Sequence, residues 1–228
     1  MLYVDNATRM WSRFGSVSAA APGHMRFETA AISRVILLEA RERVDDLMTG
    51  GVRRVSLEDS FGTSEPPAIE GVVTMHMPVM DRPPGPVEEV RGVHVTRVSD
   101  IDGLAEAEWV IVHGFPQRVH QPYLRRQALP PHVLEIPGWI AWLARRDGEP
   151  AAAGFSYDDG KAVGIYWLAT LPEHRSHGLA RAIMTKILAA HPDRAATLVS
   201  TEAGEPLYRS LGFVTVSTAV WYTLSRTN

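Results

Sequence analysis

Two Asp-Gly dipeptides, Asp147-Gly148 and Asp159-Gly160, place the strongest constraint on how this chain can fold. Apolar runs flank both dipeptides, at residues 140–145, 150–157 and 162–170. Asp-Gly between two apolar runs favours a tight hairpin turn, because both residues tolerate the positive φ angles that such a turn requires. The three runs are therefore expected to form an antiparallel meander of three strands.

Composition narrows the classes of function. The 228 residues are 45% hydrophobic and 21% charged, and the net charge of −3 gives no electrostatic footprint for nucleic acid. There is no cysteine, which excludes a disulfide framework, a thiolate metal site and a cysteine nucleophile. No histidine pair at i, i+4 is backed by a carboxylate, so no metal site is expected.

Hydropathy gives no sign of a membrane partner. No apolar stretch reaches the roughly 18 to 20 residues that a membrane helix needs. The N-terminal residues 1–15 lack the apolar core of a signal peptide. A cytoplasmic protein that binds neither membrane nor nucleic acid is therefore expected.

The segment Asp81–Pro86 is rich in proline and glycine and is the best candidate for a linker, because it cannot continue a helix or a central strand. It separates an N-terminal part, residues 1–85, from a C-terminal domain, residues 91–228. Apolar patterns in the N-terminal part predict a helix at 6–20, a strand at 32–38, a helix at 39–48, and strands at 52–57 and 72–80. No motif in this part carries recognisable chemistry.

Beyond the linker the pattern is more regular. The elements expected around the meander are a strand at 93–98, a helix at 99–113, a loop with a short helix at 117–137, a helix at 178–190, a strand at 195–200, a helix at 205–210, and a strand at 213–224 interrupted near Thr218.

The junction between the meander and the helix at 178–190 has the character of an anion site. The sequence there is Arg175-Ser176-His177-Gly178-Leu179-Ala180. The first N–H groups of a helix lack intrahelical partners, and the helix dipole adds partial positive charge, which together suit a pyrophosphate. Gly178 and Ala180 leave room for close approach, and Arg175 adds a positive charge. A second motif follows in residues 205–213, where a short helix delivers Tyr208.

Both segments resemble the GNAT superfamily of acyl-CoA N-acyltransferases. The pyrophosphate motif of that family is Arg or Gln, two residues, Gly, one residue, and then Gly or Ala, which Arg175, Gly178 and Ala180 match. Its later motif, Leu-Tyr followed by Gly-Phe, is matched by Leu207-Tyr208 and Gly212-Phe213. The resemblance covers roughly residues 91–225.

The resemblance implies an α/β (α+β) fold of the GNAT type, in which helices flank a mixed, mostly antiparallel twisted sheet. Residues 1–85 would form a smaller α/β part. Some members of the superfamily carry two similar halves of which only one binds the cofactor. The N-terminal part is therefore a candidate for a degenerate GNAT-like half.

The resemblance also implies acetyl-CoA as cosubstrate, with no metal. The backbone of Leu168, Ala169 and Thr170 would bind the pantetheine arm as an added strand, and one of these N–H groups would stabilise the oxyanion. Tyr208 would be catalytic and protonate the leaving thiolate. The remaining cofactor-binding residues would be Arg175, Ser176, His177, Gly178, Leu179 and Ala180 in the phosphate loop, and Thr201, which stands where many members have Asn.

The acceptor implied by the resemblance is a primary amine on a small molecule or peptide, in contact with residues 114–137 and the strand around Tyr157. The general base stays open between an ordered water and the side chains of Glu202, Glu173, His174 and Tyr166. The alternative function is a non-catalytic acyl-CoA-binding sensor or interaction module. Assembly as a homodimer is left open.

Overall fold

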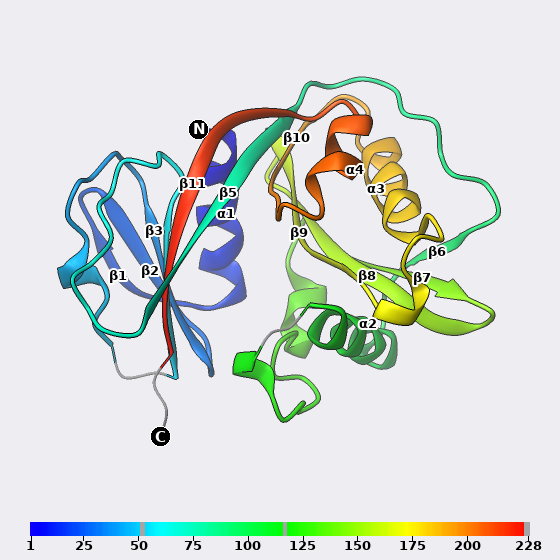
Figure 1. The fold of residues 1–228 in the computed structure, drawn as a ribbon. Coiled ribbons are helices and arrows are strands. Elements are labelled where there is room, and N and C mark those ends of the chain that lie inside the picture. The colour runs from blue at the N-terminus through cyan, green and yellow to red at the C-terminus, as the bar shows by residue number, and fades with distance from the viewer. Residues whose placement is uncertain (51–52, 116–117, 226–228) are drawn as a thin grey trace. The chain divides into compact units, whose positions relative to one another are not determined.

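The computed structural model of the chain describes residues 1–50, 53–115 and 118–225, whose helices and strands fall into two units (Figure 1). Unit 1 comprises Met1–Asp81 together with Leu198–Asn228, and unit 2 comprises Arg82–Thr197. The first boundary lies at the predicted linker, while the last residues of the chain belong with its first. Because compact units and family domains need not coincide, the domains at 1–85 and 91–228 stay a prediction.

Unit 1 contains a six-strand sheet of order β1-β2-β3-β4-β11-β5, in which every neighbouring pair is antiparallel except β3 and β4. Its elements are α1 (Leu2–Phe14), β1 (Ser16–Ala21), β2 (His24–Glu28), β3 (Ile32–Leu37), the 3₁₀ turn η1 (Asp45–Leu47), β4 (Arg54–Asp59), β5 (Val72–Arg82), α4 (Glu205–Ser210) and β11 (Val214–Ser225). The helix α1 packs against β1, β2 and β3.

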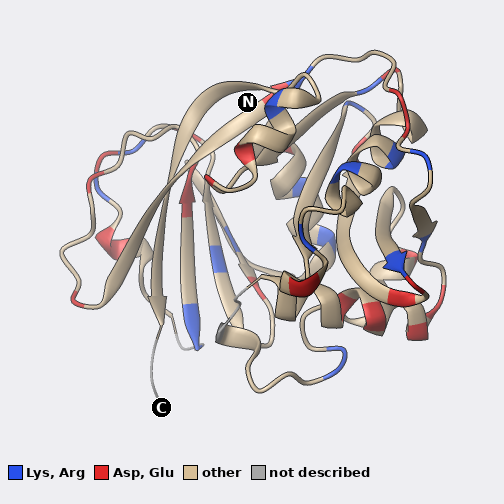
Figure 2. Cartoon of the chain, turned by 45° about the vertical axis from the view of Figure 1, so that its right-hand side comes forward, with Lys and Arg blue, Asp and Glu red and all other residues tan. Residues whose placement is uncertain are grey.

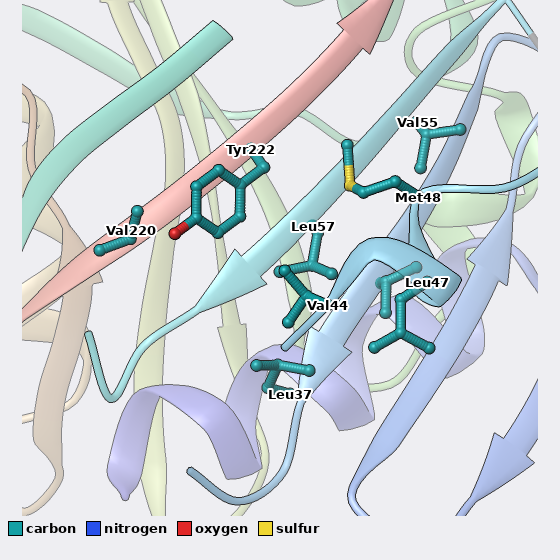
Figure 3. Packing of buried hydrophobic residues seen from close by; sticks show 9 residues of the cluster. Leu37, Val44, Leu47, Met48, Val55, Leu57, Val220 and Tyr222 are labelled. Carbon is teal, nitrogen blue, oxygen red and sulfur yellow. The ribbon is translucent and has the colours of Figure 1, made fainter. Parts of the chain in front are cut away.

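The core of unit 1 joins the two ends of the chain. Val220 and Tyr222 of β11 pack with Leu37, Val55 and Leu57 from the first sixty residues (Figure 3). The Tyr222 ring is fully buried, and its hydroxyl donates a hydrogen bond of 2.8 Å to the Ser64 carbonyl oxygen. The C-terminal strand is therefore part of this core.

Unit 2 contains the sheet order β10-β9-β8-β7-β6, antiparallel except for β9 and β10. Its elements are β6 (His94–Arg97), α2 (Ile101–Gly114), the 3₁₀ turns η2 (Arg118–His120) and η3 (Pro131–Glu135), β7 (Trp139–Arg146), β8 (Glu149–Asp158), β9 (Ala162–Thr170), the 3₁₀ turn η4 (Pro172–His174), α3 (Leu179–Ala190) and β10 (Ala195–Val199).

Strands β7, β8 and β9 form the meander predicted from the two Asp-Gly turns, and Figure 1 shows α2 and α3 on opposite sides of it. Gly148 and Gly160 have φ of +87° and +86°, the left-handed conformation that these turns require. Basic and acidic residues are interspersed along the elements in Figure 2, in keeping with the small net charge. The predicted mostly antiparallel α/β fold with flanking helices is confirmed.

The first helix predicted in the N-terminal part exists, but its bounds are wrong. The predicted helix at 6–20 begins at Leu2 and ends at Phe14, and Ser16–Ala21 form β1. Gly15 lies close to the Glu28 carbonyl oxygen, 2.7 Å from where a Cβ would stand. Pairing with β2 therefore outweighs the helix propensity of the alanines that follow.

The predicted helix at 39–48 is only the 3₁₀ turn Asp45–Leu47. The apolar residues behind this prediction are nevertheless core residues, because the side chains of Val44, Leu47 and Met48 are all buried in unit 1. The interruption expected near Thr218 is a register shift between Thr215 and Ser217 within a continuous strand.

The two units share an order of elements. In unit 1, α1 precedes three antiparallel strands, β1 to β3, and a fourth strand, β4, runs parallel to the third. In unit 2, α2 precedes β7, β8 and β9, and β10 runs parallel to β9. The connections before the parallel strands differ. The helix α3 fills the connection in unit 2, whereas the described part of the connection in unit 1 contains only the turn η1.

Candidate functional site

A β-bulge interrupts β9 at Trp167 and Leu168. Phe155 pairs with Tyr166 and Ala153 pairs with Ala169, so the two bulge residues face the single residue Gly154. Trp167 has φ of +51°, and a Cβ on Gly154 would stand 2.9 Å from the Leu168 Cα. Gly154 thus leaves the space that the bulge occupies, and the extra residue turns backbone groups out of the ladder.

This bulge was not predicted from the sequence. A glycine inside a strand is the signal that could have revealed it, because such a glycine often marks a bulge or a close backbone approach. Gly154 lies near the middle of β8 and is flanked by Ala153 and Phe155.

Within unit 2, β10 pairs with only the first residues of β9, on the edge of β9 that faces away from β8. The pairs run from Ala195–Ala162 to Thr197–Gly164. The strand β9 then continues from Ile165 to Thr170. This stretch includes the bulge and the three residues predicted to bind pantetheine, Leu168, Ala169 and Thr170.

The phosphate loop predicted from the sequence connects β9 to α3. Ser176 and Gly178 have φ of +64° and +75°, and Gly178 is the N-cap of α3. No side chain caps the start of α3, whereas the Asp100 carboxylate caps α2 by accepting from Gly103 N at 2.8 Å. A Cβ on Gly178 would meet no protein atom within 4 Å. The start of α3 therefore offers backbone donors and open space.

Side chains of the loop bond to nearby carbonyl oxygens. The Arg175 guanidinium donates from Nε to Thr170 O at 3.4 Å and from Nη2 to Gly114 O at 3.3 Å. It thereby joins the end of β9 to the end of α2. The His177 Nδ1 lies 2.6 Å from Arg175 O. Leu179 is buried and would offer only its backbone to a ligand, while Ala180 is partly exposed.

Unit 1 brings Tyr208 and Thr201 to one place around Gly204. A Cβ on Gly204 would lie 3.0 Å from Tyr208 Cε2 and 3.4 Å from Thr201 Oγ1. The Tyr208 ring is buried and makes an edge contact with Phe213 at 6.0 Å. Burial raises the pKa of the Tyr208 hydroxyl to about 12, so the hydroxyl remains a proton donor at neutral pH.

Thr201 accepts hydrogen bonds from residues that follow it closely in the chain. Its Oγ1 accepts from Gly204 N at 3.3 Å, and its carbonyl oxygen accepts from Glu205 N at 3.1 Å, close to the start of α4. Its role as a cofactor contact stays a prediction.

Glu108 is a second feature that the sequence analysis missed. Its carboxylate on α2 is fully buried and accepts from Tyr123 Oη at 3.0 Å, from Arg126 N at 2.6 Å, from Ala128 N at 2.7 Å and from Leu129 N at 3.0 Å. It therefore fixes the loop between Tyr123 and Leu129. The available signal was a glutamate at helical spacing from Leu104 and Ile111 on the apolar face.

The candidate bases lie in different environments. Glu202 and Glu173 are exposed, and His174 is partly buried in η4 just before the loop. Tyr166 is buried and stacks on Phe155 with ring centroids 5.3 Å apart. Of the expected acceptor region, residues 116 and 117 lie outside the described residues.

Two absences hold for the described parts of the chain. They contain no group of three or more His, Asp or Glu side chains arranged to hold a metal ion. No helix in them combines the length and the apolar character needed to cross a membrane.

Residues 137–215 match the acetyltransferase (GNAT) domain family, and no curated protein matches the sequence. The fold is similar to that of a GCN5-related N-acetyltransferase from Kribbella flavida, with a TM-score of 0.67 and 16% identity over 100% of this chain and 95% of that one. It is also similar to a GCN5-related N-acetyltransferase-like protein from Streptococcus suis, with a TM-score of 0.61 and 14% identity over 96% and 93% of the two chains.

At such identities the structural likeness establishes the fold, and the family match covers the meander, the phosphate loop and the motif around Tyr208. Residues 137–215 therefore resemble a GNAT acetyltransferase domain, and the chain has the fold of the GCN5-related N-acetyltransferases to which it is similar.

Proposed function

We propose that this chain is an N-acetyltransferase that transfers the acetyl group of acetyl-CoA to a primary amine on a small molecule or peptide. The observation that carries the proposal is the uncapped start of α3, where Gly178 leaves open space in front of the helix. A helix of this length with no side-chain cap suits a pyrophosphate, because the first N–H groups and the helix dipole both favour an anion.

Two segments of the chain would hold the cofactor. Arg175, Ser176, His177, Gly178, Leu179 and Ala180 would hold the pyrophosphate, chiefly through backbone N–H groups. The stretch of β9 beyond Gly164 would bond the pantetheine arm through Leu168, Ala169 and Thr170. When bound, acetyl-CoA supplies an activated acyl group whose thiolate is a tolerable leaving group.

Two groups would assist the transfer. A backbone N–H at the bulge, next to Leu168, would stabilise the developing oxyanion, because a bulge frees a donor from the strand ladder. Tyr208 would donate a proton to the leaving sulfur. The raised pKa of the Tyr208 hydroxyl keeps it protonated over the whole physiological range.

The order of elements in residues 1–85 supports a related proposal, that this part is a degenerate GNAT-like half. It repeats the helix, the three antiparallel strands and the parallel strand of unit 2, but its connection between β3 and β4 has no counterpart of α3 among the described residues. We therefore assign acetyl-CoA binding to the second half alone.

The experiment measures binding and transfer separately. Isothermal titration with acetyl-CoA is expected to show binding, and a free-thiol assay with spermidine, tryptamine and a short peptide with a free N-terminus is expected to show amine-dependent release of CoA. Absence of acetyl-CoA binding would refute the proposal. Binding without transfer to any amine would favour the non-catalytic sensor or interaction module.

A further inference from the structure

Aromatic side chains from all three strands of the meander meet beside the bulge of β9. The Phe155 ring of β8 lies at the centre of this group. Its centroid is 5.1 Å from the ring of Trp139 on β7, 5.3 Å from that of Tyr166 and 5.5 Å from that of Trp167, both on β9. Because Phe155 contacts the other three rings, the four side chains form one continuous group, which we call the aromatic wall.

The aromatic wall reaches solvent at the bulge. Phe155, Trp139 and Tyr166 are 0%, 3% and 7% exposed, whereas Trp167 is partly exposed. Trp167 directly precedes Leu168, so its indole is attached one residue from the backbone where the acyl group is proposed to react. Neighbouring Cα atoms are about 3.8 Å apart, which is similar to the distance from an amine nitrogen to a ring two carbons away. A ring joined to the reacting nitrogen by two carbons can therefore reach the Trp167 indole.

The charges of the neighbouring helix do not favour an acceptor with several positive charges. The helix α2 packs against β8 and β9, and each of its acidic side chains already has a partner within the protein. The pairs are Glu108 with the loop that follows it, Asp102 with Arg125, and Glu106 with Arg145. Recognition of a polycation needs carboxylates of complementary charge, whereas an aromatic wall suits an apolar ring.

We propose that the acceptor is an arylalkylamine, a primary amine joined by a short alkyl chain to an aromatic ring, and that Trp167 selects it. This inference rests on the proposed function. Aromatic rings prefer offset-stacked or edge-to-face contacts, which are worth more than the apolar area that they bury. The aryl ring of the acceptor would extend the aromatic wall at Trp167 and hold the amine nitrogen beside the bulge.

The first test compares two amines that have the same carbon skeleton and differ in the aromaticity of the ring. The full chain with saturating acetyl-CoA is given 2-phenylethylamine or 2-cyclohexylethylamine, and release of CoA is measured by the free-thiol assay. We expect kcat/KM to be about 3- to 10-fold higher for the phenyl compound, the range of an aromatic contact beyond area burial. Tryptamine should also be accepted, and spermidine should be poorer than either arylalkylamine.

Two variants of Trp167 test whether this residue carries the preference. Trp167→Leu should lower the phenyl-to-cyclohexyl ratio to about one, because leucine keeps an apolar side chain but has no ring. Trp167→Phe should keep most of the ratio. Neither replacement is β-branched, so both suit the positive φ of +51° at this position better than valine or isoleucine would.

The matched control is Trp109→Leu on α2. Trp109 is 40% exposed and its ring contacts the His113 ring, away from the four rings of the aromatic wall. This variant should keep the wild-type ratio. Acetyl-CoA affinity measured by isothermal titration should be unchanged in all three variants, which also shows that each one folds.

The outcomes separate this inference from the proposed function. A wild-type protein that binds no acetyl-CoA or transfers to no amine would defeat the proposed function, and the acceptor class with it. Wild-type protein that acetylates spermidine or 2-cyclohexylethylamine at least as well as 2-phenylethylamine would defeat the acceptor class alone. A folded Trp167→Leu variant that keeps the full preference would remove Trp167 from acceptor selection. Should that variant fail to fold, loss of the preference in Trp167→Phe would overturn the assignment.

Discussion

At the scale of single residues, Gly178 and Gly160 have the same backbone conformation in different places. Their φ angles are +75° and +86°, and a Cβ at either position would meet no protein atom within 4 Å. Gly178 begins α3 in the phosphate loop, whereas Gly160 lies in the hairpin turn between β8 and β9. The two glycines form a matched pair for separating backbone strain from ligand contact.

We expect Gly178→Ala and Gly160→Ala to lower the free energy of unfolding by a similar amount, about 1–2 kcal/mol, because each places a Cβ in the left-handed region. Only Gly178→Ala should weaken acetyl-CoA binding, by at least about tenfold, or about 1.4 kcal/mol. Urea denaturation and isothermal titration measure the two effects. Equal acetyl-CoA affinity in the two variants would speak against the loop as the phosphate site.

Tyr208 links burial to the pH dependence of stability. An unfolded tyrosine loses its proton at about pH 10, whereas the folded Tyr208 keeps it until about pH 12. A folded-state pKa raised above the unfolded value gives stability that is present below pH 10 and is lost as the pH rises toward 12. Because the ring is buried, the loss is expected to be about 2–3 kcal/mol.

The matching measurement compares urea denaturation of the wild type and Tyr208→Phe at pH 9, 10 and 11. The phenylalanine variant should show a shallower decrease, because it lacks this titrating group. Parallel curves would contradict the raised pKa.

Tyr208→Phe also tests the proton donor at the sulfur. We expect kcat to fall by about 10- to 100-fold, a modest share of the general-acid range, because a thiolate leaves without much help. Acetyl-CoA affinity measured by isothermal titration should be unchanged, since the phenyl ring keeps the contact with Phe213. An unchanged kcat would remove Tyr208 from the mechanism.

At the scale of elements, the loop after α2 depends on one carboxylate. Glu108 accepts from three backbone N–H groups and the Tyr123 hydroxyl. The isosteric Glu108→Gln variant would turn an amide NH₂ toward some of these donors. We expect it to lower the free energy of unfolding by about 2–4 kcal/mol, because buried donors are left without an acceptor.

Glu106→Gln is the control on the same helix. Glu106 pairs with Arg145 at the surface, and such pairs contribute about 0–1 kcal/mol. Hydrogen exchange should rise at residues 126–129 in Glu108→Gln and stay unchanged in Glu106→Gln. Equal protection in both variants would mean that other contacts hold the loop.

Some elements can be predicted from the sequence and others cannot. The meander and the loop between β9 and α3 were predicted because Asp-Gly turns and helix starts are encoded by neighbouring residues. The bulge at Trp167 and the loop fixed by Glu108 depend on residues distant in sequence. The helix expected at 39–48 failed because tertiary packing of Val44 and Leu47 outweighed local propensity.

At the scale of the whole molecule, the two halves differ where a cofactor would bind. The parallel pair β3 and β4 is joined from Ile32–Arg54 through Ile36–Glu58, and a buried ion pair between Arg34 and Glu58 joins the same strands. The Arg34 guanidinium also lies 4.2 Å above the Trp11 ring. In the connection that follows β3, Arg41 donates to both Asp46 oxygens at 2.8 Å.

We therefore expect one acetyl-CoA to bind per chain. Isothermal titration should give a stoichiometry near one, and Arg175→Ala should weaken binding while Arg41→Ala leaves it unchanged. Arg41 is the matched control because its positive charge is already paired with Asp46. A stoichiometry near two would show that the first half keeps a working site.

The place of β11 has a consequence for biosynthesis. Unit 2 is one continuous stretch, Arg82–Thr197, and all of it is synthesised before β11. Unit 1 cannot close its sheet until β11 emerges, because β11 lies between β4 and β5. Unit 1 is therefore begun before unit 2 but completed after it, and until β11 is made the core residues that pack on Val220 and Tyr222 lack these two partners.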